Sequence, residues 1–141
     1  MRVASSITIY TDGGARGNPG PAGSGAVIYD GGKKVAEVSA YLGIQTNNFA
    51  EYEALILVLH KTAELFGSPL ARPVHVRMDS ELIVKQMKGE YKVKNPVLKE
   101  KYTRVKMLIA ESFPHISFTH VRREKNAEAD ALANAAMDRG G

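Results

Sequence analysis

Three apolar stretches lie near the beginning of the chain, at residues 7–10, 24–29 and 35–42, and hydrophobic and polar positions alternate in the first of them. Alternation with a period of two is typical of strands that bury one face. The connection Asp30-Gly31-Gly32 is a tight hairpin signal, whereas the connection over residues 13–23 is longer and rich in Gly and Pro. The pattern therefore predicts three antiparallel strands.

The period changes to that of a helix over residues 48–66, and Gly67 stands where this helix should end. A strand follows at residues 73–79. The remaining pattern predicts a helix, a second helix, a strand and a last helix at residues 80–88, 96–112, 115–122 and 126–137. This order favours an α/β fold with one mixed sheet and helices on its faces. We expect residues 1–141 to form a single domain with a core over about residues 7–137.

Composition narrows the chemistry and the setting. The chain has no cysteine, which excludes disulfides, thiolate nucleophiles and Cys-ligated metal sites, and favours a reducing cytoplasmic setting. No apolar run reaches the roughly 18 residues of a membrane span. We therefore expect a soluble protein that makes no membrane contact.

The formal net charge of +4 is unevenly distributed along the chain. Residues 85–125 contain eleven Lys or Arg and four Glu, and the rest of the chain is net acidic. The basic run is a candidate surface for a polyanion, but a solvated helix face is the simpler interpretation of a charge run taken alone. Lys92 and Lys94 lie in residues 89–95, a stretch that fits either a linker or a substrate-facing loop.

Four acidic residues stand near the ends of the expected strands and helices. Asp12 follows the first strand and Asp79 ends the fourth, whereas Glu51 and Asp130 lie in the opening turns of helices. Each has a structural explanation when taken alone. Asn48 with Glu51 resembles a helix-capping pair, Asp79 fits a cap of the next helix, and the helix dipole stabilises Asp130.

Taken together, the four acids point to a metal site if the ends of their strands and helices meet at one edge of the sheet. Carboxylates this close repel one another unless cations lie between them, and oxygen ligands without His or Cys favour Mg²⁺ or Mn²⁺. Two such ions roughly 4 Å apart support in-line displacement at a phosphate. The glycines after Asp12 should leave room for a bulky anion to approach.

Four motifs, in this order and at these separations, resemble type 1 ribonuclease H: TDGGARGNPGPAGSGAVI, TNNFAEYEAL, the MDS of VRMDSELIV, and HVRREKNAEADALAN. The resemblance implies the ribonuclease H-like fold, a five-stranded mixed sheet in the order 3-2-1-4-5 with strand 2 antiparallel. It also implies hydrolysis of the RNA strand of RNA–DNA hybrids with two Mg²⁺ ions, leaving 5′-phosphate and 3′-hydroxyl ends. Mn²⁺ is a possible substitute ion.

The resemblance also assigns roles to single residues. Asp12 matches the acid that bridges both ions, Asp79 a ligand of the water-activating ion, and Glu51 and Asp130 ligands of the other ion. The resemblance implies contacts to the hybrid from Asn18, Thr46 and Asn47. From charge alone we also expect contacts from Lys92 and Lys94 of the basic run, and from Arg122 or Arg123 at the scissile phosphate. Two alternatives stay open, because Asn18 also fits a plain turn residue, and Thr46 or Asn47 a helix cap.

The chain departs from the family pattern at two places. The loop that carries a histidine in many relatives is short here, and His120 is expected in a strand on the face of Ile116 and Phe118, in a structural role. The basic insertion of some relatives is also missing. The chain thus resembles the short form of the family, without a separate hybrid-binding domain. We expect a monomer, with double-stranded RNA as a further candidate partner. A non-catalytic binder and a nuclease acting on DNA junctions are the competing hypotheses.

Overall fold

The structure, a computed structural model, describes residues 5–140; residues 1–4 and 141, which the expected single domain also includes, lie outside this range. In chain order the strands and helices are β1 (Ile7–Ala15), β2 (Gly20–Asp30), β3 (Lys33–Gln45), α1 (Asn47–Phe66), β4 (Val74–Met78), α2 (Glu81–Met87), α3 (Pro96–Ser112), β5 (Ile116–His120), the short 3₁₀ helix η1 (Arg123–Lys125) and α4 (Ala127–Gly140). The expected order is confirmed, with η1 as an addition.

The five strands form one mixed sheet in the order β3-β2-β1-β4-β5. β2 is antiparallel to β1 and β3, whereas β4 runs parallel to β1 and β5 runs parallel to β4. Gly31 and Gly32 both have positive φ in the turn between β2 and β3, which only glycine adopts without strain in this pairing. The strand order and directions confirm the expected ribonuclease H-like fold.

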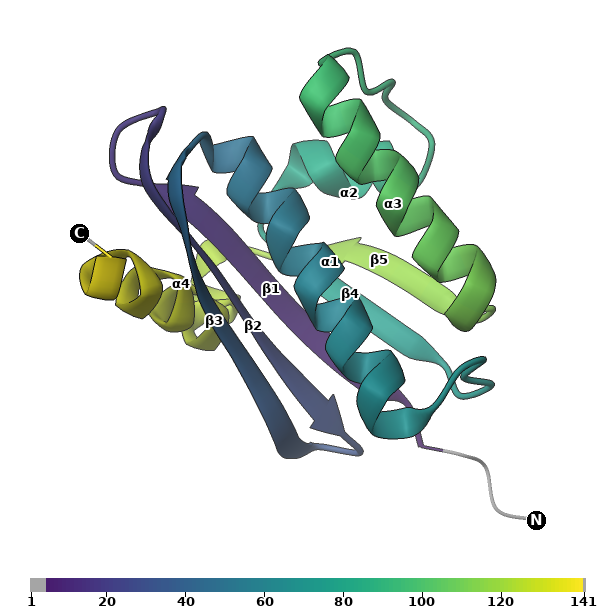
Figure 1. Ribbon diagram of the computed structural model, residues 1–141. Helices are drawn as coiled ribbons and strands as arrows, with labels where there is room; N and C mark the ends of the chain where they lie inside the picture. The colour runs from purple at the N-terminus through teal and green to yellow at the C-terminus, as the bar shows by residue number, and fades with distance from the viewer. Residues whose placement is uncertain (1–4, 141) are drawn as a thin grey trace.

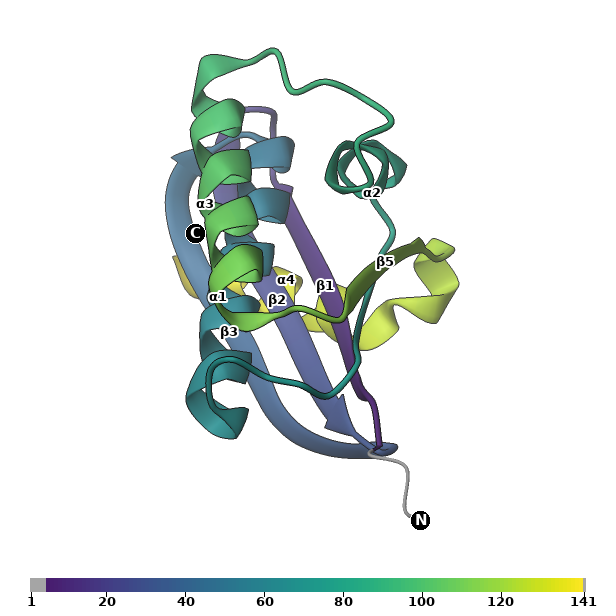
Figure 2. The same ribbon diagram turned by 90° about the vertical axis from the view of Figure 1, so that its right-hand side faces the viewer.

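Helices cover both faces of the sheet (Figure 1). α1 packs across β1 and β2, and α4 packs on the opposite face against β2 and β3. α3 lies beside α1, as the view turned by 90° also shows (Figure 2). The main core lies under α1, where alternate residues of the central strands, such as Ile7, Ile9, Val74 and Val76, are fully buried with Leu55. The alternation in the sequence therefore marks this buried face correctly.

β1 is longer than the sequence pattern predicts. It continues through the first glycines to Ala15, so that Asp12 pairs with Gly25 inside the β1–β2 hairpin instead of following the strand. The expected long turn over residues 13–23 shrinks to the few residues between Ala15 and Gly20. The glycines were expected to end the strand, but here they belong to it.

Close packing of helices on the sheet explains these glycines. A Cβ on Gly13 would lie 2.5 Å from the backbone nitrogen of Glu51 in α1. On the opposite face, a Cβ on Gly23 would lie 2.6 Å from the backbone oxygen of Ala133, and one on Gly25 would lie 2.5 Å from its backbone nitrogen. The glycines therefore admit α1 and α4, and the expectation that they mainly open a path for an anion is wrong for Gly13.

Candidate active site

Three acidic side chains from different parts of the chain meet at one edge of the sheet. Asp12 lies in β1, Glu51 in α1 and Asp79 directly after β4, and each offers a carboxylate oxygen within 4.8 Å of the other two. Asp12 and Glu51 are each only 7% exposed, and Asp79 is half-buried. The structure thus brings together three of the four expected metal ligands.

The parallel pairing of β1 with β4 places two of these acids. Thr11 is in register with Met78, so Asp12 and Asp79 follow at the same edge of the sheet. Glu51 arrives through the close approach of α1 to Gly13, and the hydroxyl of Ser24 holds that approach by donating to the Ala50 carbonyl at 2.7 Å. The backbone of three neighbouring segments therefore fixes the triad.

Asp130 stands on α4 and lines the same cleft as the triad, although it does not belong to the tightest group. Asn126, the residue before α4, attaches this helix to β1, because its side-chain amide donates to the Thr11 carbonyl at 2.8 Å. Asn126 was expected in the last helix, but it lies directly before it, and its side chain bonds a neighbouring strand. The attachment places Asp130 beside Asp12.

Burial and like charge perturb the carboxyls of this cluster. Desolvation, followed by the charge of Asp79 and a hydrogen bond with Asp130, raises the pKa of Asp12 from 3.8 to about 7. Desolvation and the charge of Asp12 raise the pKa of Glu51 well above its usual value. Glu51 also has a buried carboxylate oxygen, Oε2, that has no hydrogen-bond partner among the described residues. The cluster therefore concentrates negative charge, and none of its carboxylates forms an ion pair with a described side chain.

The caps of α1 and α2 decide between alternatives that the sequence leaves open, and Thr46 caps α1 as one of them predicts. Thr46, not Asn48, caps α1, since its hydroxyl accepts from the Phe49 backbone N–H at 3.2 Å. Glu51 consequently lies beyond the first turn of α1, and the expected capping pair is wrong. Ser80 caps α2 by accepting from Ile83, which leaves the carboxylate of Asp79 free for other partners. Neither Glu51 nor Asp79 therefore serves as a helix cap, which was the structural role considered for each.

A cleft of about 780 Å³ extends from the acidic cluster. Of the residues expected to contact a hybrid, Asn47, Arg122 and Arg123 line it. Asn18 lies at its border, where its Oδ1 accepts from the Asn47 backbone N–H at 3.0 Å, and Asn47 Oδ1 accepts from the Ala15 backbone N–H at 2.8 Å. These bonds tie the β1–β2 turn to the start of α1.

The basic run is only partly available to a ligand. Lys101 is 8% exposed, pairs with Glu53 at 2.7 Å and lies over the Phe49 ring at 3.9 Å. Lys85 pairs with Glu81 at 2.9 Å. Lys101 therefore joins α3 to α1, and Lys85 forms an ion pair within α2, so the charges of both lysines are engaged by carboxylates of the protein.

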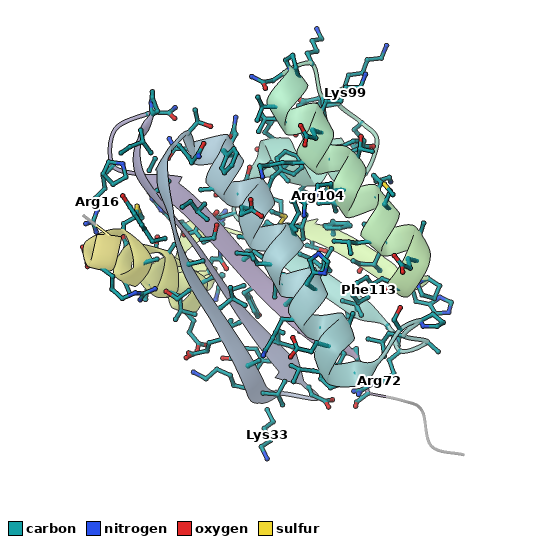
Figure 3. The ribbon with its side chains drawn as sticks, in the orientation of Figure 1. Arg16, Lys33, Arg72, Lys99, Arg104 and Phe113 are labelled. Atoms are coloured by element: carbon teal, nitrogen blue, oxygen red, sulfur yellow. The ribbon has the colours of Figure 1, made fainter. Side chains whose placement is uncertain are left out.

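Lys92 and Lys94, by contrast, are exposed in the connection between α2 and α3. They do not line the cleft. Lys99 lies in the first turn of α3, is exposed and points away from the sheet (Figure 3). Part of the exposed positive charge thus lies on the α2–α3 connection and the start of α3, outside the cleft.

Two polar residues of the cleft were missed or misplaced by the sequence pattern. His120 was expected among the buried residues of its strand, but it ends β5, is exposed and lines the cleft. Its strand ends earlier than predicted, so the alternation no longer applies there. Asn134 also lines the cleft, and its spacing of four residues from Asp130 on one helix would have indicated this.

Comparisons with known proteins agree with this geometry. The family described as Reverse transcriptase-like matches residues 10–136. The crystal structure of LC11-RNase H1 in complex with an RNA/DNA hybrid, from a protein isolated from compost, is 56% identical to this chain. It superposes with a TM-score of 0.91 over 95% of this chain and 98% of that chain.

Two curated relatives are each 45% identical over 94% of this chain: ribonuclease HI of Halobacterium salinarum and the bifunctional protein Rv2228c of Mycobacterium tuberculosis. The chain spans 64% of the length of the first and 35% of the length of the second. Sequence and fold agree over nearly the whole chain, which therefore belongs to the type 1 ribonuclease H family.

Proposed function

We propose that this chain is a metal-dependent endoribonuclease that hydrolyses the RNA strand of RNA–DNA hybrids and leaves 5′-phosphate and 3′-hydroxyl ends. The observation that carries the proposal is the largely buried cluster of Asp12, Glu51 and Asp79, with carboxylate oxygens within 4.8 Å, in a cleft that Arg122 and Arg123 also line. A relative with 56% identity has a crystal structure in complex with an RNA/DNA hybrid, which supports the same substrate here.

The donor set fits a hard divalent cation. Its ligands are carboxylate oxygens without His or Cys, and the buried Glu51 Oε2 still needs a partner. We propose two Mg²⁺ ions, with Mn²⁺ as a substitute, held by Asp12, Glu51, Asp79 and Asp130. When bound, such ions activate a water molecule and stabilise the leaving oxygen at a phosphodiester.

The protein's own side chains hold the substrate around this centre. Arg122 and Arg123 place guanidinium groups in the cleft, where one of them can bind the scissile phosphate through two hydrogen bonds. The free amide groups of Asn18 and Asn47 supply donors at the other wall, and Thr46 contributes through its cap of α1. Lys92 and Lys94 are proposed to bind phosphates of the hybrid outside the cleft.

A substrate panel tests the proposed function. We expect cleavage of the RNA strand of a labelled hybrid in Mg²⁺ or Mn²⁺, and little or none of duplex DNA or DNA junctions; double-stranded RNA is included as the further candidate substrate. Tight hybrid binding without cleavage in either metal would favour the non-catalytic binder, and cleavage of junctions alone would favour the DNA nuclease. Either result would overturn the proposal.

Repulsion among the acidic side chains of the metal-free cluster should make the free energy of unfolding depend on pH. The folded-state pKa of Asp12 is raised above its value of 3.8, so the stability that its protonated form provides is complete below about pH 4 and is lost as the pH rises through about 7. Without divalent cations, wild type should therefore lose about 2–4 kcal/mol relative to Asp12→Asn between pH 4 and pH 8. Chemical denaturation of both proteins across this range measures the difference.

The Asp12→Asn protein serves as the matched reference, because titrating groups outside the acidic cluster are common to both proteins and cancel. The charge of Asp12 also raises the pKa of Glu51, so the difference between the two proteins reports the repulsion between Asp12 and its neighbours in the cluster. Millimolar Mg²⁺ should stabilise wild type at pH 8 more than at pH 5 and should stabilise the variant much less. Equal pH profiles for the two proteins would show that Asp12 carries no such repulsion.

The described helices include none that is long and apolar enough to cross a membrane. We further propose that the chain acts in the cytoplasm, in keeping with its lack of cysteine, and that it acts as a single-domain monomer.

A further inference from the structure

One face of α4 forms the wall of the cleft where the cleft extends past the acidic cluster. Asp130, Asn134 and Met137 recur at helical spacing on this face, and all three line the cleft. At about 1.5 Å per residue, Asn134 lies about 6 Å along the helix axis from Asp130. The cleft is therefore longer than a metal centre needs, and it follows α4 away from the cluster.

The far end of this part of the cleft is closed by Arg16 from the β1–β2 turn. Arg16 pairs with Asp138 at 2.5 Å, and Figure 3 shows it beside the end of α4 near the C-terminus. Gly14 lines the floor of this part of the cleft without a side chain, and a Cβ there would just reach van der Waals contact with Asn47 Oδ1 and the Met137 methyl group at 3.8 Å. A nucleic-acid strand that crosses the acidic cluster can therefore continue along α4 toward the guanidinium group of Arg16.

The side-chain amide of Asn134 has a defined orientation in this space. Its Nδ2 donates to the backbone carbonyl of Asp130 at 3.0 Å. The reverse orientation would set two oxygens against each other, so the carbonyl oxygen Oδ1 is the atom left over. No described residue donates a hydrogen bond to Oδ1, and Asn134 is half-buried at the cleft wall. The wall therefore presents a hydrogen-bond acceptor that needs a donor from the ligand.

The backbone of a nucleic acid offers acceptors almost everywhere, since phosphate, ring and ester oxygens have no proton to donate. Its one donor is the ribose 2′-hydroxyl, which also distinguishes RNA from DNA. We propose that Asn134 Oδ1 accepts a hydrogen bond from the 2′-hydroxyl of a ribonucleotide adjacent to the scissile phosphate. Asn134 would then be a specificity-determining residue of the RNA strand, an inference that rests on the proposed hydrolysis of hybrids.

Paired changes in protein and substrate test this contact. Asn134→Ala should lower kcat/KM on an all-ribose hybrid with one defined cleavage site by about three- to tenfold, the usual effect of one hydrogen bond. A series of hybrids then carries one 2′-deoxy substitution at each ribonucleotide near that site. At one position, the 2′-deoxy change should lower wild-type kcat/KM by a similar factor and should cost the variant nothing further.

Additive losses at all positions, or an unchanged kcat/KM for Asn134→Ala, would overturn the proposal. Ala131→Ser, at an exposed position of the same helix, is the matched control. It should leave kcat/KM at the wild-type value on the all-ribose hybrid and on each 2′-deoxy hybrid. Thermal unfolding of Asn134→Ala checks that α4 still packs normally. If wild type fails to cleave any hybrid, the proposed function fails, and the same substrate series measured by equilibrium binding still decides whether Asn134 senses the 2′-hydroxyl.

Discussion

Replacing Asp12 by Asn should reduce hybrid cleavage by about 10³-fold or more, while hybrid binding persists. Asp12 lies at the centre of the acidic cluster: its carboxylate is within 4.8 Å of Glu51 and Asp79, and its pKa also responds to Asp130. The amide keeps the size of the side chain but removes the charge that holds a divalent cation. Single-turnover cleavage of a labelled hybrid at saturating Mg²⁺ measures the loss.

Glu111→Gln is a suitable control for this change. Glu111 is exposed on α3 and makes no ion pair among the described residues, so removing its charge should leave the cleavage rate within about twofold. Binding of the hybrid by the Asp12→Asn protein shows that the loss lies in the chemical step. Cleavage by that protein within tenfold of wild type would refute the role proposed for Asp12.

Replacing Gly13 by Ala should disrupt the acidic cluster almost as severely as Asp12→Asn, because it should displace α1. The Cβ of Gly13→Ala would lie 2.5 Å from the Glu51 backbone nitrogen, and backbone cannot move aside as a flexible side chain can. We expect a loss of about 3 kcal/mol or more in the free energy of unfolding, at the upper end of overpacking effects. Any folded fraction should have α1 displaced, with Glu51 too far from Asp12 for joint metal binding.

Gly14→Ala provides the comparison, because it adds the same methyl group one residue further along β1. There the new Cβ meets nothing closer than 3.8 Å, so the free energy of unfolding should change by less than about 1 kcal/mol. Urea denaturation of both variants, with Mg²⁺ titration of the folded proteins, separates the two effects. Equal stabilities for Gly13→Ala and Gly14→Ala would contradict the packing account of Gly13.

The sequence predicts much of this fold because its local signals agree with one another. The alternation of Ile7 and Ile9 marks a buried face, Gly67 ends α1, and the Gly31-Gly32 turn sets the β2–β3 hairpin. The ordered motifs then place the acidic residues at strand and helix boundaries. These boundaries meet at one edge of the sheet because β1 and β4 pair in parallel. The resemblance to the family predicts this pairing.

The remaining details depend on contacts between distant segments, which no local pattern encodes. Gly13 looks like a strand breaker until α1 is placed against it, and Lys101 looks like a surface charge until Glu53 lies beside it. His120 follows the buried alternation of its strand but lies where the strand leaves the sheet. In each case tertiary packing overrides the local signal.

Three consecutive residues of β1 position all the helices and side chains that form the acidic cluster. The Thr11 carbonyl receives Asn126 ahead of α4, Asp12 contributes its carboxylate, and Gly13 receives α1. Inserting or deleting one residue in this tripeptide would turn its side chains to opposite faces and separate all the acids in a single step. The turns far from this tripeptide are free of that constraint, so chains of this architecture can change their outer loops extensively while the spacing within residues 11–13 stays fixed.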